Sequence, residues 1–224
     1  MPTEPTHYCE GQARLELGTG FFRPESRPSR DFGVLLLRWM QAQNPDRVGV
    51  GVLDGMAGCG IRALRWGLEA LPEVGSGVEL WVNDADPDRL PLLKTNLAPL
   101  ASRVQVLKLS AMPAEVLLAR AFAEKRFFDL IDLDAFGSPS ALIQPVLQVL
   151  AFDGVLLLAS TDGRSPTGHD RPGAIRSFGA AARAHPASWE LALRLQLVQQ
   201  LPWAPRGVLS CWALQLRARQ LPQP

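Results

Sequence analysis

Short runs of apolar residues alternate along the chain with longer segments in which an apolar residue recurs every three or four positions. The short runs are typical of buried strands, and the longer segments are typical of helices. Regular alternation of the two predicts a mostly parallel sheet with helices on both faces, which is a doubly wound α/β fold. The predicted strands cover residues 48–54, 77–82, 103–109, 127–133 and 152–161, and the helices between them cover 61–71, 86–97, 113–124 and 138–150.

The N-terminal part of the chain does not follow this alternation. Residues 1–9 contain prolines and predict a loose arm, and residues 10–17 alternate enough for a short strand. Glycine and proline exclude a regular helix from residues 18–32, so this segment is interpreted as a loop, and a helix is predicted over 31–42. The predicted organisation is therefore an arm (1–9), an N-terminal element packed on the main domain (10–47) and the main domain itself (48–224).

The C-terminal part begins with a polar segment, residues 162–172, which is rich in glycine and proline. Such a composition predicts a surface-exposed loop. Helices are predicted to follow at about 173–183 and 188–201, and a last strand at about 208–216.

Charge is unevenly distributed along the 224 residues, although the formal net charge is only +1. Residues 48–163 carry nine Lys or Arg and fourteen acids, whereas residues 164–224 carry eight Arg and two acids. An acidic centre beside a basic tail fits a site that binds a cation and a surface that binds phosphates.

Several classes of protein are disfavoured by the sequence. No apolar run has the length of a membrane span, and no basic-then-apolar leader begins the chain, so a cytoplasmic location without membrane contact is expected. The cysteines Cys9, Cys59 and Cys211 lie far apart and form no paired motif, so we predict neither a disulfide framework nor a metal site.

A glycine-rich loop, residues 55–60, joins the first predicted strand of the main domain to its helix. Gly58 and Gly60 allow the backbone to approach a ligand closely, and the start of the helix offers N–H groups to an anionic end of that ligand. Asp54, at the end of the strand, is suited to attract a cationic part. The loop is therefore predicted to bind a cofactor.

The next two strands end in residues that complete a nucleoside site. Asp84 is suited to accept hydrogen bonds from both ribose hydroxyls, and the turn Ser110-Ala111 is expected beside the adenine. The glycine loop also fits the pattern G-x-G-x-x-A, so these residues alone fit a nicotinamide dinucleotide about as well as a methyl donor.

The stretch 127–139, FFDLIDLDAFGSP, distinguishes the two cofactors. Its strand brings Asp134, Phe136 and Gly137 to one point, at the same sheet edge as the cofactor residues. A carboxylate beside an aromatic ring is suited to hold a flat base and to take a proton from its amino group, which a dehydrogenase does not need. We therefore interpret Asp134 and Phe136 as the substrate end of a methyltransferase site.

The loop over 18–32 combines aromatic and cationic residues. Phe21 and Phe22 lie beside Arg23, Arg27 and Arg30. Such a set can stack on a base and bind phosphate, and it can equally form a hydrophobic plug with solvated arginines. The local sequence leaves both interpretations open.

Several stretches together resemble one family, the tRNA guanine-N2 methyltransferases that dimethylate guanine-26 and use S-adenosylmethionine. The resemblance extends over about residues 10–216 and implies a class I methyltransferase fold of the Rossmann-like type. The matching stretches are Glu10-Gly11, Phe21-Phe22-Arg23-Pro24, Ser29-Arg30-Asp31, the segment from Asp54 to Arg65, Asn83-Asp84, the segment from Asp129 to Pro139, Ser160-Thr161-Asp162 and the segment from Arg176 to Ala180.

The resemblance also implies roles for individual residues. Phe21 and Phe136 would flank the target guanine, and Asp134 would face its exocyclic amino group. The residues implied to hold the cofactor are Arg30, Arg62, Asp84, Ser110 and Ala111.

This chain departs from the family pattern at Ala135, which replaces a proline, at Arg23, which replaces an asparagine, and at Ser110, which replaces an aspartate. We expect this chain to lack the C-terminal domain that helps the family to hold tRNA. We therefore expect tRNA or another structured RNA as substrate, with a protein partner as one way to replace that domain. The alternatives are a methyltransferase acting on another base or amine, and a non-catalytic relative that binds RNA or a nucleotide.

Overall fold

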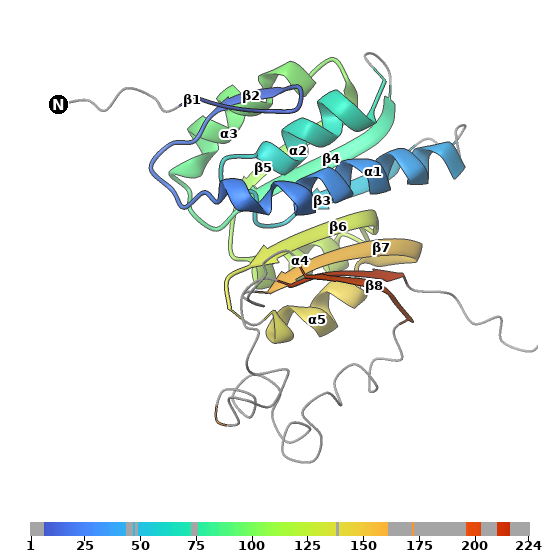
Figure 1. Ribbon diagram of the computed structural model, residues 1–224. Helices are drawn as coiled ribbons and strands as arrows, with labels where there is room; N and C mark the ends of the chain where they lie inside the picture. Colours follow the sequence, from blue (N-terminus) through green and yellow to red (C-terminus); the bar gives the residue numbers. More distant parts are fainter. Residues whose placement is uncertain are drawn as a thin grey trace, which may run out of the picture. The chain divides into compact units, whose positions relative to one another are not determined.

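The computed structural model describes residues 7–43, 47, 49–72, 76–137, 139–160, 172, 196–202 and 210–215, the last two ranges by their backbone only. The chain divides into two compact units, residues 1–124 and residues 125–224. Figure 1 labels the helices and strands of both units. Each unit is described by itself below.

A parallel sheet forms the centre of the first unit. Its strands are β3 (Val50–Asp54), β4 (Ser76–Asp84) and β5 (Val104–Ala111), in the order β5-β4-β3. Every residue of β3 is buried, in agreement with the polar-free run over residues 50–53 that precedes Asp54. Since Asp54 pairs with Val82 and Asp84 pairs with Ala111, the carboxyl ends of the three strands lie at one edge.

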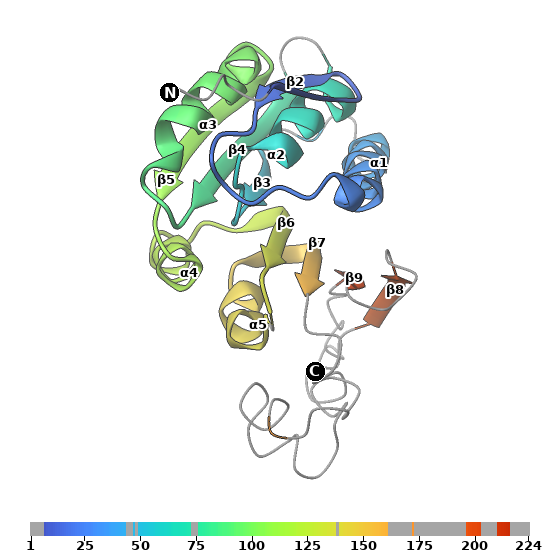
Figure 2. The same ribbon diagram turned by 60° about the vertical axis from the view of Figure 1, so that its left-hand side comes forward.

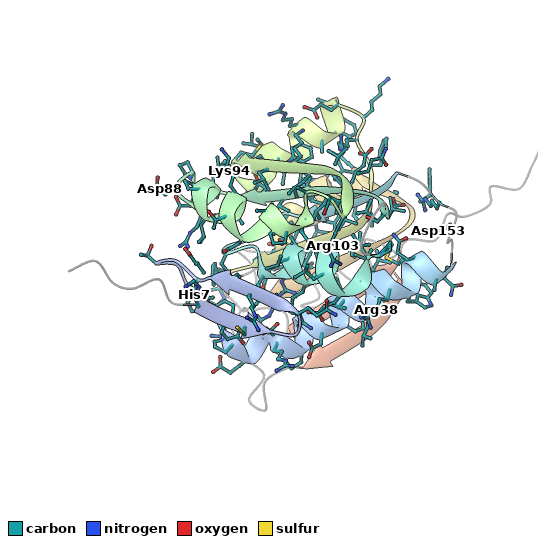
Figure 3. All side chains as sticks on the ribbon, turned by 90° about the horizontal axis from the view of Figure 1, so that it is seen from above. His7, Arg38, Asp88, Lys94, Arg103 and Asp153 are labelled. Carbon is teal, nitrogen blue, oxygen red and sulfur yellow. The ribbon has the colours of Figure 1, made fainter. Side chains whose placement is uncertain are left out.

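The helices of the first unit follow the predicted order, but the first begins at Arg27, which corrects the loop predicted over residues 18–32. Pro28 lies in the first turn of this helix, where a proline is tolerated. The helices are α1 (Arg27–Gln43), α2 (Ile61–Arg65), α3 (Arg89–Leu97) and α4 (Ala114–Ala123), and α2 continues into the π-helical turn η2 (Trp66–Ala70). Two fully buried tryptophans, Trp66 and Trp81, belong to the core between helices and sheet. Charged side chains such as Arg38, Asp88 and Lys94 lie on the outside of this unit (Figure 3).

The N-terminal segment is a hairpin, which corrects the predicted arm and single strand. β1 (His7–Glu10) pairs antiparallel with β2 (Ala13–Glu16), so residues 7–9 are part of a strand. Gly11 has a φ of 57° in the reversal between them, a conformation that glycine adopts without strain. Figure 2 shows the hairpin over α2 and α3, where the Asn96 side chain accepts from the Glu16 amide (3.0 Å) and donates to the Glu16 carbonyl (2.8 Å).

The second unit contains the parallel strands β6 (Phe128–Ala135) and β7 (Leu150–Ser160), joined through helix α5 (Ser140–Leu147). β9 (Ser210–Gln215) pairs antiparallel with β7, and β8 (Gln196–Pro202) pairs antiparallel with β9. Within this unit the strands therefore lie in the order β6-β7-β9-β8.

β8 corrects the helix predicted over 188–201, since residues 196–201 are strand. The apolar residues of this segment are too few to distinguish the helical period from the strand period, and the pairing with β9 decides the outcome. The loop predicted over 162–172 and the helix predicted over 173–183 lie outside the described residues, apart from residue 172.

Alternation of parallel strands with helices continues through both units, as a doubly wound fold requires. Among the helices that the structure describes, none combines the length and the apolar character needed to span a bilayer.

Candidate functional site

The glycine loop closes tightly on the edge of the sheet in the first unit. The Ala57 amide donates to the Asn83 carbonyl (2.9 Å), and the Gly60 amide donates back to the Ala57 carbonyl (2.8 Å). Gly58 and Gly60 have φ values of 57° and 82°. A Cβ added to Gly58 would have no atom within 4 Å, so the loop has an open side at this position.

Asp84 is fixed against this open side. Its Oδ2 accepts from the Gly58 amide (2.8 Å), and its Oδ1 accepts from the Asp86 amide (3.0 Å). An ionised carboxylate can accept about four hydrogen bonds, so capacity remains for two hydroxyl donors. Asp54 lies at the same sheet edge, at the end of β3, and is only 1 % exposed. The edge therefore presents one partly exposed and one buried carboxyl group.

Ser110 takes part in a hydrogen-bond network that sequence reasoning did not anticipate. Its hydroxyl accepts from Trp81 Nε1 (2.7 Å) and donates to Asn83 Oδ1 (2.8 Å). The Asn83 amide in turn donates to the carbonyls of Gly55 (3.1 Å) and Met112 (2.9 Å). The hydroxyl of Ser110 thus joins β4 to β5, and only its remaining lone pair is available to an adenine amino group.

The lysine ammonium of Lys108 lies 3.4 Å from the centroid of the Trp81 ring. It also lies 3.5 Å from a carboxylate oxygen of Glu124. These contacts support the same tryptophan whose Nε1 donates to the Ser110 hydroxyl.

Arg30 is buried in an ion pair, although the resemblance implies a cofactor role for it. Its guanidinium donates to Glu10 through two nitrogens, Nε to Oε1 (2.8 Å) and Nη2 to Oε2 (2.6 Å). The remaining contacts of this guanidinium go to the carbonyls of Arg23 and Pro24, at 3.2 Å each. Most of the donors of Arg30 therefore hold the chain itself, and a cofactor would have to use what is left of Nη1.

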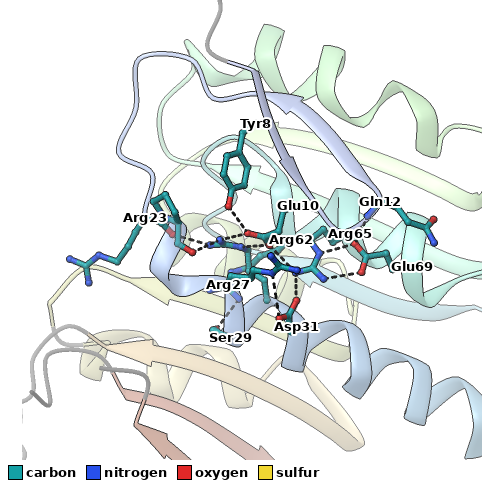
Figure 4. Close-up of polar contacts among 12 residues, drawn as sticks. Tyr8, Glu10, Gln12, Arg23, Arg27, Ser29, Asp31, Arg62, Arg65 and Glu69 are labelled. Atoms are coloured by element: carbon teal, nitrogen blue, oxygen red, sulfur yellow. Dashed lines mark hydrogen bonds and ion pairs between the residues drawn. The ribbon is translucent and has the colours of Figure 1, made fainter. Parts of the chain in front are cut away.

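Arg65 meets the same glutamate from α2 (Figure 4). Its Nη1 donates to Glu10 Oε1 (2.8 Å) and lies 2.6 Å from Asp31 Oδ1, while Nε and Nη2 each donate to Glu69 at 2.8 Å. The Tyr8 hydroxyl donates to Glu10 Oε2 (3.0 Å). We call this group the buried charge cluster; its members are Tyr8, Glu10, Arg30, Asp31, Arg65 and Glu69.

Contacts within the cluster shift the pKa values of its members. Burial by itself would raise the pKa of Glu10, but the hydrogen bonds and charge of Arg30 outweigh it and hold that pKa below its ordinary value. Arg65 lowers the pKa of Glu69 against burial in the same way, and Glu69 raises the pKa of Arg65. All three groups are therefore charged at neutral pH.

Arg62 lies beside the cluster and is 6 % exposed. Its Nη1 donates to the Ser29 hydroxyl (3.2 Å), which joins α2 to the first turn of α1. This contact places the guanidinium in the interior between the two helices.

Phe21 and Phe22 have different environments, so the interpretation as a hydrophobic plug fits Phe22 and not Phe21. Phe22 packs edge-to-face on Tyr8, with ring centroids 4.7 Å apart, and the Arg30 guanidinium lies 5.1 Å above its ring. Phe21 is 67 % exposed, with the guanidinium of Arg23 5.6 Å from its ring. Phe22 is the hydrophobic plug, and Phe21 is presented to solvent.

The remaining predicted residues belong to the second unit. Asp134, near the end of β6, is partly exposed, and Phe136 is 72 % exposed just after the strand. Ala135, where the resemblance has a proline, continues β6 and is buried. That Asp134 and Phe136 meet the residues of the first unit at one site remains a prediction.

Among the members of the buried charge cluster, the sequence indicated a role only for Arg30. The one signal for Glu10 and Arg65 was that both stand in stretches of the family resemblance. Among the residues that the structure describes, no group of histidine, cysteine or acidic side chains has the arrangement of a metal site.

Comparisons with known proteins place these features in context. Residues 14–202 match the model of a family described as N2,N2-dimethylguanosine tRNA methyltransferase. Two curated relatives named tRNA (guanine(26)-N(2))-dimethyltransferase are similar to the chain: the Pyrococcus furiosus protein is 32 % identical over 170 residues, and the human protein is 31 % identical over 149 residues. These alignments cover 70 % and 66 % of this chain but only 41 % and 22 % of the relatives.

Solved structures show the same fold. Trm1 from Pyrococcus horikoshii in complex with S-adenosyl-L-methionine matches with a TM-score of 0.72 at 21 % identity, over 95 % of this chain and 61 % of that one. The tRNA m1G37 methyltransferase of M. jannaschii matches with a TM-score of 0.62 at 13 % identity, over 98 % of this chain and 59 % of that one. This likeness confirms the predicted doubly wound, Rossmann-like fold of the class I methyltransferases.

Proposed function

Since the chain belongs to the N2,N2-dimethylguanosine tRNA methyltransferase family, we propose that it transfers a methyl group from S-adenosylmethionine to the exocyclic N2 amine of a guanine in tRNA. The chain spans less than half the length of the two curated relatives compared above, so the activity of those proteins is a proposal for this one. The observation that carries the proposal is the open side of the glycine loop at Gly58, with the Asp84 carboxylate fixed against it.

The residues at this edge fit S-adenosylmethionine, which is a nucleoside that carries a cationic sulfonium and an amino acid end. Asp84 would accept hydrogen bonds from the ribose hydroxyls, because each of its oxygens keeps a free lone pair. Gly58 leaves room for close approach, whereas a Cβ at Gly60 would meet Leu93 and Leu97, so Gly60 would serve the packing of the loop. Asp54, at the end of β3, would attract a cationic part of the ligand. Ala111 would contribute its backbone and small side chain beside the adenine. The bound cofactor supplies the electrophilic methyl group.

Arg62 and Arg30 take secondary parts in this proposal. Both are buried with their side chains engaged in the protein, Arg62 with Ser29 and Arg30 with Glu10. Their contribution to the cofactor would come mainly from positive charge near the carboxylate of its amino acid end, and Ser110 would offer a single lone pair to the adenine amino group.

Asp134 and Phe136 would do the work on the substrate. The guanine N2 lone pair is delocalised into the ring, so the amine is a poor nucleophile until a base accepts its proton. The Asp134 carboxylate would accept a hydrogen bond from N2–H and take the proton, a contribution that is typically about 10²–10⁴-fold in rate. Phe21 and Phe136 would stack on the base, which has to leave its own stack at a cost of a few kcal/mol.

Titration with S-adenosylhomocysteine and methyl transfer to unmodified tRNA test the two halves of the proposal separately. Asp134→Asn should lower the rate of transfer by about 10²-fold or more, since an amide cannot take the proton, and should leave the affinity for S-adenosylhomocysteine unchanged. Asp84→Asn is the matched change at the other half and should weaken that affinity. Full turnover in Asp134→Asn would remove the general-base role.

Two finer expectations belong to the same proposal. We place the protein in the cytoplasm with its tRNA substrate, and we expect a protein partner to add tRNA contacts if the chain alone methylates slowly. Fractionation tests the first, and recovery of the rate on addition of a defined partner tests the second.

A further inference from the structure

We propose that Glu10 is a positioning residue for RNA binding, because it fixes the loop that presents Phe21. This inference rests on the proposed function, since the base that stacks on Phe21 is taken to be the target guanine. It differs from the proposed function in one testable respect: Glu10 affects the affinity for RNA and not the affinity for the cofactor.

Glu10 is held on several sides by buried partners. Its side chain has 0 % exposure, and it receives hydrogen bonds from Arg30, Arg65 and Tyr8 at distances of 2.6–3.0 Å. Arg30 approaches with two nitrogens on the two carboxylate oxygens, an arrangement that fixes orientation as well as distance. Glu10 can therefore serve as a rigid anchor for Arg30.

Arg30 passes this rigidity to the loop. The same guanidinium donates to the carbonyls of Arg23 and Pro24, and it lies over the ring of Phe22. The Tyr8 ring also packs edge-to-face with Phe22, and its hydroxyl donates to Glu10. The backbone immediately after Phe21 is thus tied to Glu10 through one buried side chain.

As a consequence, the buried charge cluster fixes the position of the exposed Phe21 ring. Phe21 is 67 % exposed, next to Phe22, which is packed, and Arg23 lies over the Phe21 ring. Ordering a loop and its side chains at the moment of binding costs affinity, so a loop that is ordered beforehand binds its ligand more tightly. Stability alone does not account for the cluster, because a buried ion pair is often no more stabilising than packed apolar residues.

A merely structural role for Glu10 makes a different prediction. If Glu10 only stabilised the fold, its replacement would disturb the aromatic loop and the glycine loop alike, and affinities for RNA and cofactor would fall together. If Glu10 positions Phe21, only the RNA affinity falls, and it falls through Phe21.

A double-mutant cycle between Glu10 and Phe21 separates these roles. Glu10→Gln and Phe21→Ala should each raise the KM for tRNA by about tenfold, and the double variant should be no worse than Phe21→Ala. The affinity for S-adenosylhomocysteine should stay within about twofold of the wild type in all three. The proposal would be overturned if the increases in KM of the two single variants multiplied in the double variant. A parallel loss of S-adenosylhomocysteine binding would overturn it as well.

Glu69→Gln is the control variant. It removes a partner of Arg65 but leaves the contacts of Arg30 intact, so the KM for tRNA should not change. Arg30→Lys should reproduce the effect of Glu10→Gln on the KM for tRNA, because a lysine keeps the charge and loses the two-nitrogen contact. A rise in KM with Glu69→Gln equal to that of Glu10→Gln would contradict the proposal.

Hydrogen exchange gives a readout that needs no RNA. In Glu10→Gln, backbone amides of residues 18–26 should exchange faster while those of residues 55–60 keep the wild-type rate. Wild-type protein that neither binds nor methylates tRNA would refute the proposed function, and the exchange result would still decide whether Glu10 holds the loop. Unchanged exchange at 18–26 would overturn the positioning role itself.

Discussion

Two loops of the first unit are proposed to contact ligands, and they are held in shape by different interactions. The glycine loop, residues 55–60, is closed by short backbone hydrogen bonds and by a carboxylate from the neighbouring strand. The aromatic loop, residues 18–26, is held by a buried arginine whose partner, Glu10, lies in β1. The first loop depends on glycine conformations, whereas the second depends on charges removed from water.

The difference affects how each loop responds to change. In the glycine loop, a side chain added to one glycine strains its own turn and, at Gly60, also the contact with Leu93. In a buried charge cluster, removal of one member leaves its direct partners charged and poorly solvated. The two loops should therefore differ in how much unfolding free energy a substitution costs, in the pH dependence of that free energy and in the reactivity of their cysteines.

The largest effect is expected for Glu10→Ala, which leaves Arg30 and Arg65 without their shared carboxylate. Breaking a buried ion pair by removing one partner costs about 3–5 kcal/mol of unfolding free energy. Urea unfolding measures this loss. As the matched control, Glu124→Ala removes the exposed partner of Lys108 and Arg120 and should leave the midpoint almost unchanged. Equal losses in the two variants would contradict the assignment.

A smaller effect is expected in the glycine loop. Gly58→Ala and Gly60→Ala both force a left-handed conformation on alanine, which costs roughly 1–2 kcal/mol in each case. Gly60→Ala should lose more, because its Cβ would come within 2.9 Å of Leu93 Cδ2, whereas nothing lies within 4 Å of a Cβ at Gly58. Thermal unfolding of the two variants measures the difference.

The order of the two variants should be the reverse for ligand affinity: Gly58→Ala should lose more affinity for S-adenosylhomocysteine than Gly60→Ala. Gly58→Ala should weaken S-adenosylhomocysteine binding more than it weakens the fold, because the added methyl group occupies the open side of the loop. If Gly58→Ala binds S-adenosylhomocysteine as the wild type does, the ligand does not lie against Gly58.

Acid should weaken the buried charge cluster that supports the aromatic loop, and the unfolding free energy should fall with it. The pKa values of Glu10 and Glu69 are lowered in the folded protein from the ordinary 4.5, so the unfolded chain takes up protons before the folded one. The stabilisation is then fully present above about pH 4.5 and is lost as the pH falls through the lowered values. Unfolding free energy measured against pH should fall less steeply in Glu10→Gln than in the wild type. An identical slope would show that the pKa of Glu10 is not lowered in the folded protein.

The smallest effect concerns the thiols. Burial raises the pKa of Cys59 in the glycine loop, so little reactive thiolate is present at neutral pH, whereas Cys9 in β1 is exposed. Iodoacetamide labelling mapped by peptide mass should therefore modify Cys9 well before Cys59. Faster labelling of Cys59 would mean that the glycine loop opens readily.

The comparison also shows what the sequence could predict. The glycine loop was predicted with its flanking strand and helix, because glycines after a buried apolar run are a local signal. The support of the aromatic loop was not predicted, since Arg30 and Glu10 are 20 residues apart and nothing local pairs them. The same limit explains β8, where pairing with β9 overrides a segment whose apolar spacing fits a helix as well.

Individual site residues follow the same rule. Asp84 was predicted at the sheet edge because a parallel sheet brings strand ends together, and the register agrees. The engagement of Ser110 by Trp81 and Asn83, and the burial of Arg30, depend on side chains from other elements. Sequence position alone therefore placed Asp84 and Ser110 at the carboxyl ends of their strands. It gave neither the partners of Ser110 nor the position of Arg30, which was predicted in a loop and lies in α1.

Methyl transfer to unmodified tRNA, followed by nucleoside analysis of the digested product, tests the central claim most directly. The account predicts that N2-methylguanine forms with S-adenosylmethionine as donor and that its formation falls sharply in Asp134→Asn. Methyl groups found on another base, or no transfer by protein that binds S-adenosylhomocysteine, would contradict the assignment of guanine N2 as the acceptor.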